Sequence, residues 1–134
     1  DRGAFLSWLF FTSNALHQAA LAMFYPHRPA GEANTDAARA AAQEQIVARL
    51  GLIEALIATQ SPRWLSADHP GVLGYYIGIL VRWLLLLPPA PYGIDLADFP
   101  YLKAVLAAHE ARPAALRVAA SDGLGPTPFT NPGT

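Results

Sequence analysis

A continuous apolar run over residues 72–87 constrains the fold of this chain more than any other feature. It reads VLGYYIGILVRWLLLL, and Arg82 is its one charged residue. As a helix the run is apolar on every side, so it must lie inside a protein or a membrane. Its 16 residues are shorter than the roughly 20 that span a bilayer, and a central arginine opposes insertion by about 2.5–3.5 kcal/mol. We therefore predict a fully buried central helix and no membrane span.

The spacing of the apolar residues also predicts how this helix packs. Heptad spacing gives a seam of Leu73, Ile77, Leu80, Leu84 and Leu87. Arg82 needs an opposite charge in such surroundings, and Asp95 and Asp98 in the following loop are the candidates. We favour this structural ion pair over a ligand contact of Arg82.

Composition limits the class of protein. A chain of 134 residues fits one domain, and without cysteine it has no disulfide. Nine basic and ten acidic residues give a net charge of −1 with no basic cluster, which argues against nucleic-acid binding. Only 14% of the residues are charged and 53% are hydrophobic, so we expect an apolar face that a partner or a ligand covers. The lack of cysteine and of a secretory signal pattern favours a cytoplasmic location.

Apolar residues at three- and four-residue spacing predict four further helices. They cover about residues 4–24, 36–60, 100–110 and 113–121. In the second of them the apolar stripe is Ile46, Leu50, Ile53 and Ile57. No segment alternates with period two for long enough to be a strand. The prediction is an all-α five-helix bundle over residues 1–124, followed by a proline-rich tail over 125–134.

Several short segments, in this order, resemble the helical C-terminal domain of bacterial glutathione transferases. The segments are 8–11 (WLFF) with 15–17 (ALH), 24–26 (FYP), 80–83 (LVRW), 99–103 (FPYLK), 111–114 (ARPA), and Gly123 with Phe129. The resemblance covers nearly the whole chain and implies the five-helix fold of that domain. It also implies a partner that this chain lacks, an N-terminal thioredoxin-like domain that supplies most of the glutathione site. A homodimer is implied too, and we expect this chain alone to be inactive.

The first predicted helix carries the polar residues that are candidates for a binding or catalytic role. Ser13, Asn14 and His17 are three and four residues apart, so they share a polar patch on an apolar helix. In the beta class, which this helix resembles, a histidine at the position of His17 approaches the glutathione thiol. That class follows the histidine with lysine, whereas Gln18 stands here. The alternative is that His17 only forms a hydrogen bond within the fold.

The resemblance implies two small-molecule substrates, glutathione and an apolar electrophile that its thiolate attacks. Phe10, Leu21 and Trp83 are candidates to line the pocket for the electrophile, because apolar walls suit such ligands. The alternative for these three residues is ordinary core packing. The four histidines have no spacing typical of a metal site, so we expect no metal.

The central helix departs from the family pattern at its start. The family opens this helix with Ser/Thr-x-x-Asp as an internal cap, whereas Gly71 and Gly74 stand at those positions. We expect Asp68 or His69 to cap the helix instead. Gly71, Gly74 and Gly78 lie on one side of the helix, so they predict the close approach of another backbone.

Three other functions stay open at this point. The first is a non-catalytic member of the family that serves in assembly, and the loss of the cap and of the lysine leans toward such divergence. The second is a glutathione-dependent isomerase or reductase on the same scaffold. The third is an unrelated helical ligand-binding domain.

Overall fold

The computed structural model describes residues 1–133, and all five predicted helices are present in it. The predicted first helix consists of α1 (Arg2–Phe11), the π-helical turn η1 (Thr12–Leu16) and α2 (His17–Phe24). The other four are α4 (Thr35–Gln60), α5 (Val72–Leu85), α6 (Pro100–Glu110) and α7 (Pro113–Ser121). Short helical turns join them, namely α3 (His27–Ala30), η2 (Glu32–Asn34), η3 (Arg63–Leu65) and η4 (Leu96–Asp98). The part of the chain described here is all-helical and contains no β-strand.

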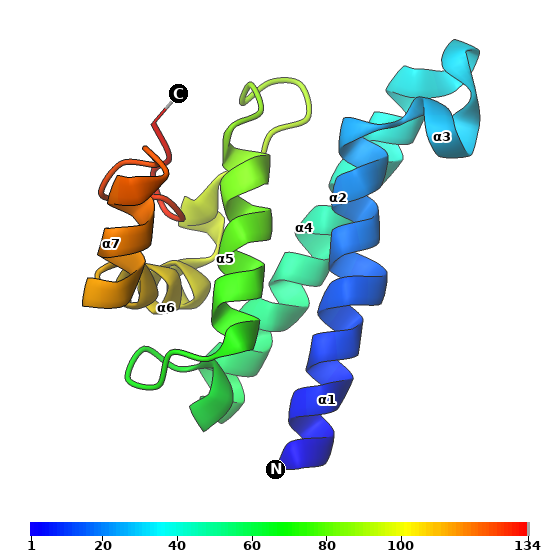
Figure 1. Ribbon diagram of the computed structural model, residues 1–134. Helices are drawn as coiled ribbons and strands as arrows, with labels where there is room; N and C mark the ends of the chain where they lie inside the picture. Colours follow the sequence, from blue (N-terminus) through cyan, green and yellow to red (C-terminus); the bar gives the residue numbers. More distant parts are fainter. Residues whose placement is uncertain (134) are drawn as a thin grey trace.

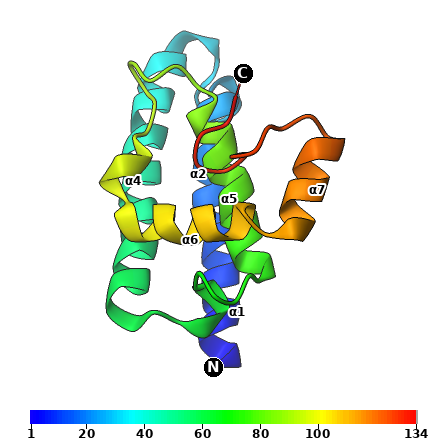
Figure 2. The ribbon, with the colours of Figure 1, turned by 90° about the vertical axis from the view of Figure 1, so that its left-hand side faces the viewer.

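The helix α5 stands in the middle of the molecule. Figure 1 shows α2 on one side of it and α7 on the other. In the view turned by 90°, α6 runs across α4 and α5 (Figure 2). The long helix α4 packs against both α2 and α6, so it ties the two halves of the bundle together.

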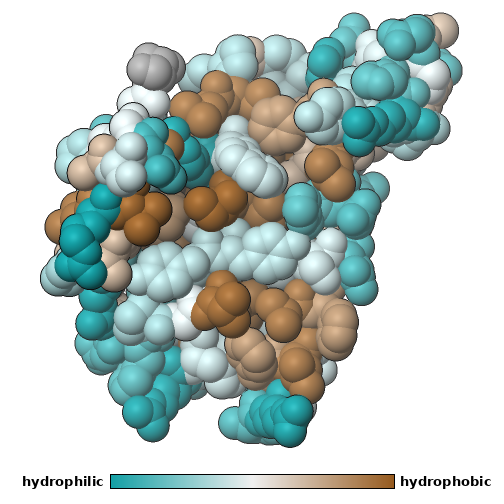
Figure 3. Space-filling model, viewed as in Figure 1, coloured by the Kyte–Doolittle hydropathy of each residue, from teal (hydrophilic) through white to brown (hydrophobic). Residues whose placement is uncertain are grey.

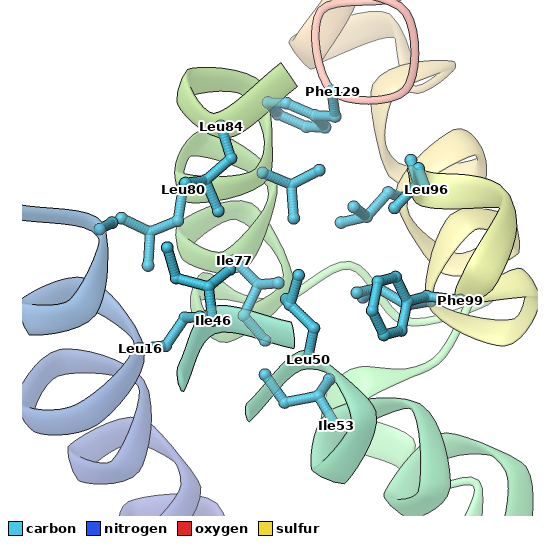
Figure 4. Packing of buried hydrophobic residues seen from close by; sticks show 14 of the residues in the cluster. Leu16, Ile46, Leu50, Ile53, Ile77, Leu80, Leu84, Leu96, Phe99 and Phe129 are labelled. Carbon is cyan, nitrogen blue, oxygen red and sulfur yellow. The ribbon is translucent and has the colours of Figure 1, made fainter. Parts of the chain in front are cut away.

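The core forms where α2, α4, α5 and α6 meet (Figure 4). Three of its α4 residues, Ile46, Leu50 and Ile53, are fully buried, and Ile57 is buried too. The apolar stripe predicted for α4 is therefore confirmed. Each such side chain stabilises the fold by about 1.5–3 kcal/mol through burial. From α5 the core receives four of the five predicted seam residues, Leu73, Ile77, Leu80 and Leu84, each at most 1% exposed.

The prediction that α5 is buried on every side was wrong. Two of its residues, Val72 and Trp83, are 64% and 39% exposed. Leu87, the fifth seam residue, lies beyond the end of α5 and is only partly buried. The reason is that the elements that contact α5, mainly α6 and the turn η3, do not enclose the helix. We call Val72, Tyr76, Ile79 and Trp83 the open side of α5, and Leu73, Gly74, Ile77, Leu80, Val81 and Leu84 its packed side.

The helix starts are capped differently from the prediction. Gly71 is the N-cap of α5, and neither Asp68 nor His69 caps this helix with its side chain. The carbonyls of Ala67 and Asp68 instead accept hydrogen bonds from Arg112, at 3.2 and 2.8 Å. By contrast, α6 is capped from another helix. The Glu54 carboxylate on α4 accepts from the amides of Tyr101 (2.9 Å) and Leu102 (2.7 Å), where the helix dipole favours a negative charge.

Side-chain rings, and not a backbone, approach two of the three glycines of α5. A Cβ on Gly74 would lie 2.4 Å from Nδ1 of His109, and one on Gly78 would lie 3.0 Å from the Phe129 ring. Only Gly71 faces a backbone atom, the carbonyl oxygen of Trp64, at 3.5 Å. The predicted approach of a backbone was therefore wrong for Gly74 and Gly78, where the missing side chains make room for the rings of His109 and Phe129.

The described part of the predicted tail, residues 125–133, is irregular yet packs against the bundle. Phe129 is only 6% exposed. The Glu110 carboxylate, itself 3% exposed, accepts from the amides of Phe129 (2.8 Å) and Thr130 (3.1 Å) and from the Thr130 hydroxyl. We call residues 127–130 the C-terminal turn.

The C-terminal turn also receives Arg82. Its Nη1 donates to the carbonyl of Pro128 at 3.2 Å. Within residues 1–133, Arg82 makes no hydrogen bond to Asp95 or Asp98, so the predicted ion pair is not formed. Asp95 instead caps η4, where it accepts from the amide of Ala97 at 2.8 Å. The guanidinium thus donates to a buried carbonyl 46 residues away, which spacing along the sequence could not reveal.

Candidate functional site

The π-helical turn η1 interrupts the first long helix where the polar residues lie. Such turns are rare, and they are frequent at functional sites. Side chains satisfy carbonyls around this one. The Thr12 hydroxyl donates to Trp8 (2.9 Å), the Ser13 hydroxyl donates to Phe10 (3.2 Å), and Arg49 on α4 donates to Ala15 (3.2 Å). The turn is therefore held by its own side chains and by α4.

Directly after this turn, His17 contacts the open side of α5. Its Nδ1 lies 2.7 Å from the hydroxyl of Tyr76, and the two rings meet edge to face with their centroids 5.7 Å apart. The ring of Trp83 lies 5.9 Å from that of His17. One histidine from α2 and two aromatic residues from α5, which are seven residues apart, thus form a single cluster. We call His17, Tyr76 and Trp83 the His17 cluster.

The hydrogen bond between Tyr76 and His17 limits what His17 can do. Burial raises the pKa of the Tyr76 hydroxyl, so this phenol keeps its proton at neutral pH. It can therefore donate to Nδ1 of a neutral His17, which then carries its own proton on Nε2. In the described residues, Nε2 has no hydrogen-bond partner. The arrangement can present an N–H donor, or a base after rearrangement, to a ligand.

The predicted glutathione-binding residues are neighbours but do not form one network. Ser13 lies in η1, and its hydroxyl can donate either to the carbonyl of Phe10 or to the side chain of Asn14, each at 3.2 Å. Asn14 is exposed, and neither residue is hydrogen-bonded to His17 in residues 1–133. The shared polar patch expected from their spacing is therefore a row along the helix, with His17 at its end.

The predicted electrophile pocket is not assembled as one cavity. Leu21 lines a hollow of about 330 Å³ toward α3, together with Gln18, Tyr25 and Arg28. Trp83 belongs to the His17 cluster, and Phe10 is 60% exposed on α1. None of the hollows described here is lined by either of these two residues. The alternative that Trp83 is ordinary core does not hold, because Trp83 is 39% exposed on the open side of α5.

An uncovered apolar surface adjoins the His17 cluster. No residue of α1 is buried, although its sequence RGAFLSWLFF is mostly apolar. Leu6 and Phe10 of α1 are 36% and 60% exposed, and Val72 lies at the nearby start of α5. Figure 3 shows the apolar patch over α1 and the start of α5, below a paler band in the middle of this face. We call Leu6, Phe10 and Val72 the α1 patch.

Tyr76 and the π-helical turn were missed by the sequence analysis. Tyr76 lies 59 residues from His17, and nothing in its neighbourhood singles it out within an apolar run. A signal was present in its seven-residue spacing from Trp83, which places both on one side of a helix. The π turn has no comparable signal, because Arg49 on another helix helps to form it.

Outside the His17 cluster, the described residues offer few other candidate sites. Residues 1–133 contain no set of three His, Asp or Glu side chains that could hold a metal ion. Another hollow, of about 470 Å³, lies between the end of α2, the start of α4 and the loop after α5, and Asp36 and Arg39 are its charged residues. None of the helices in this range is both long and apolar enough to cross a membrane.

Comparisons with family models, with curated proteins and with solved structures give no match for this chain. The functional conclusion must therefore come from the site itself.

Proposed function

We propose that this chain is the substrate-side helical domain of a glutathione transferase-like protein. In the proposed reaction, glutathione thiolate attacks an electrophilic small molecule, with a thioredoxin-like domain supplying the rest of the glutathione site. A cytoplasmic location and a homodimer belong to the same proposal. The observation that carries it is the His17 cluster, a histidine held by Tyr76 beside an uncovered apolar surface.

The geometry of His17 suits a group that acts on a thiol. A thiolate is the nucleophile in thiol chemistry, and hydrogen-bond donors lower the pKa of a thiol. With Nδ1 occupied by Tyr76, a neutral His17 has an N–H at Nε2 to donate to a sulfur atom. Gln18 contributes no positive charge at the position where the beta class has lysine. In the proposal, His17 therefore positions or hydrogen-bonds the thiol, and activation of the thiol falls mainly to the other domain.

The apolar surface supports a role for this chain next to another folded unit. Monomeric soluble proteins rarely expose large contiguous apolar patches, and such patches mark partner or ligand sites. Figure 3 shows apolar surface over α1 and the start of α5, and Tyr76 and Trp83 of the His17 cluster belong to the open side of the same helix. A domain seated there would cover these residues and would enclose the His17 cluster.

The test is a glutathione-conjugation assay on the full-length protein with a panel of electrophiles, together with binding to immobilised glutathione. We expect His17→Ala to lower kcat/KM by about 10- to 100-fold, as for loss of a positioned donor. Tyr76→Phe should have a smaller effect, because only the orientation of His17 is lost. His27→Ala and Tyr101→Phe, at exposed positions outside the cluster, are the matched controls.

Two results would contradict the proposal. One is full-length protein that neither binds glutathione nor converts any electrophile. The other is an upstream coding sequence in which the preceding roughly 80 residues lack a thioredoxin-like βαβ pattern with its cis-proline.

A second candidate function, a non-catalytic assembly module of the same fold, is favoured by α1. An apolar helix without one buried residue suits a permanent partner better than a small substrate. In that case, Phe10→Ser would weaken association of the protein while His17→Ala would have no effect on any activity. The conjugation assay and the association measurement therefore separate the two candidates.

A further inference from the structure

The connector between α4 and α5, residues 61–71, is the green loop below α6 in Figure 1. Side chains from the junction of α6 and α7 hold it. The carbonyl of Ser66 accepts from Nε2 of His109 at 3.0 Å, and the next two carbonyls accept from Arg112, at 3.2 and 2.8 Å. Because the connector is irregular apart from the short turn η3, these hydrogen bonds to three consecutive carbonyls fix its path.

The ring of His109 is closed in on its other side by α5. It is fully buried, and its Nδ1 lies against Gly74, where a Cβ would be only 2.4 Å away. Since Nε2 donates to Ser66, the neutral ring carries its proton on Nε2, and Nδ1 has no hydrogen-bond partner among residues 1–133. A second proton on Nδ1 would be an N–H without an acceptor, which is costly in a buried place. The closed connector therefore accepts only the neutral form of His109.

The charged and titratable groups around His109 do not offset a second proton. The guanidinium of Arg112, at the start of α7, repels it, and the Tyr75 ring of α5 packs against His109 with centroids 5.4 Å apart. On α6 itself, the carboxylate of Glu110 accepts from the C-terminal turn, and the connector offers a carbonyl. Burial, and then the Arg112 charge, lower the pKa of His109, so the ring is neutral at pH 7 and is protonated only as the pH falls.

The same connector contacts α1 through Trp64. The ring of Trp64 meets that of Phe5 edge to face, with centroids 6.0 Å apart. Trp64 and Ser66 are two residues apart in the chain, so a movement of the Ser66 carbonyl also moves Trp64. No residue of α1 is buried, and the partly buried Phe5 is among those that hold α1 to the bundle. A release of the connector would therefore loosen the attachment of α1.

We propose that His109 and the connector form an acid-sensitive latch. While the ring is neutral, the connector is closed over it and Trp64 stays on Phe5. When Nδ1 takes up a proton from water, the ring leaves Gly74 so that the new N–H finds a partner, and the hydrogen bond to Ser66 breaks. The connector then moves with Trp64 away from α1, which carries most of the α1 patch. This proposal does not rest on the glutathione transferase-like function, since it uses no residue of the His17 cluster.

Proton linkage gives the size of the effect. A histidine that takes up a proton only when the latch is open favours opening as the pH falls below about 6.5, the ordinary pKa of histidine. From about pH 7.5 to about pH 5.5, the fraction of open connector rises about tenfold. Above about pH 6.5 this fraction is nearly constant, so the closed connector has its full stability there.

The experiment is amide hydrogen exchange of the full-length protein, followed by NMR and expressed as protection factors, which removes the pH dependence of the chemical exchange step. The amides of Leu65 and His69 donate to carbonyls within the connector, so they report its opening. We expect their protection to fall about tenfold over this pH range, together with that of Leu9 in α1. Low concentrations of urea should change it little, because local opening exposes little surface. Protection of the buried Ile53 should instead follow global unfolding and respond strongly to urea.

Two variants assign the pH dependence to one ring. His109→Gln keeps a side-chain amide that can donate to Ser66 but binds no proton, so the tenfold fall should disappear. His69→Gln, at an exposed position of the same connector, is the matched control and should keep the full fall.

The latch is supported if protection at Leu65, His69 and Leu9 falls together with the pH, depends little on urea, and no longer falls in His109→Gln. It is overturned if these amides respond to urea as Ile53 does, because they then open only when the whole domain unfolds. It is also overturned if Leu9 does not follow the connector, or if the fall persists in folded His109→Gln. If circular dichroism shows that His109→Gln is unfolded, the pH and urea dependence of the wild type and of His69→Gln decides.

Discussion

Two histidines contact α5 from opposite sides, and their surroundings differ in almost every respect. His109 of α6 is fully buried and packs its ring against Gly74. His17 of α2 is partly buried and meets Tyr76. Gly74 and Tyr76 are two residues apart, which is a rotation of about 200° around an α-helix. One helix thus separates a histidine enclosed by the fold from a histidine open to a ligand.

The hydrogen bonds of the two rings explain the difference. Nε2 of His109 donates to the carbonyl of Ser66 at 3.0 Å, and its Nδ1 is buried without a partner. Protonation at Nδ1 would place an N–H against α5 with nothing to accept it, so this ring belongs to the packing. His17 has the reverse arrangement, with Nδ1 paired and Nε2 without a partner among the described residues. We infer that the packed side of α5 holds the fold and that the open side is available for function.

The largest expected loss of stability comes from a substitution on the packed side of α5, at Gly74. A Cβ there would lie 2.2 Å from Cε1 of His109, a ring with no room to move. We expect Gly74→Ala to lower the free energy of unfolding by about 3 kcal/mol through overpacking. The matched control is Gly51→Ala in α4, where nothing lies within 4 Å, and it should stabilise by about 0.5–1 kcal/mol. Urea denaturation measures both changes, and equal effects of the two substitutions would contradict the packing.

Removing the buried carboxylate of Glu110 should lower the free energy of unfolding slightly less than Gly74→Ala does. Glu110→Ala leaves the amides of Phe129 and Thr130 without their acceptor, which costs about 2–3 kcal/mol. The exposed Glu44→Ala is the control, with a change within about 0.5 kcal/mol. Thermal unfolding measures both. An unchanged melting temperature for Glu110→Ala would show that the C-terminal turn does not depend on this carboxylate.

The packed side should also make stability depend on pH. Burial lowers the pKa of His109 below its ordinary value of about 6.5, and the nearby Arg112 charge acts in the same direction. The unfolded chain therefore binds a proton that the folded chain resists, so stability is full above about pH 6.5 and falls as the pH drops below it. Denaturation midpoints between pH 8 and pH 5 test this. His69→Gln, at an exposed position, should keep the slope, and a slope that survives in His109→Gln would have another source.

The smallest effect on stability is expected on the open side and its surroundings. Phe10 is 60% exposed, so Phe10→Ser should change the free energy of unfolding by about 0.5 kcal/mol or less. Leu80→Ala, on the packed side, should cost about 3 kcal/mol in the same experiment. If Phe10→Ser destabilised the protein as much as Leu80→Ala, the two sides of α5 would not differ as we describe.

The sequence predicted the helices better than it predicted their surroundings. Periodicity located the stripe of Ile46, Leu50 and Ile53 because burial of one face repeats with the helical turn. It failed for α5, since an apolar sequence shows that a surface avoids water but not which element covers it. The predicted ion pair of Arg82 with Asp98 was wrong, because the guanidinium instead donates to a carbonyl 46 residues away. His17 was singled out by its polar neighbours and by the resemblance of its helix to the beta class, and its role stays a prediction. Tyr76 could not be found in this way, because its contact with His17 depends on tertiary packing.

The most direct test of the difference between the two sides is a glutathione titration followed at the histidine rings by NMR. The titration uses the full-length protein, and the signals of the four histidines in this chain are assigned by single substitution. We predict that the His17 ring signals shift in a saturable way and that those of His109 stay in place. Unmoved His17 signals at millimolar glutathione, or shifts of His17 no larger than those of the exposed His27 and His69, would contradict a functional open side.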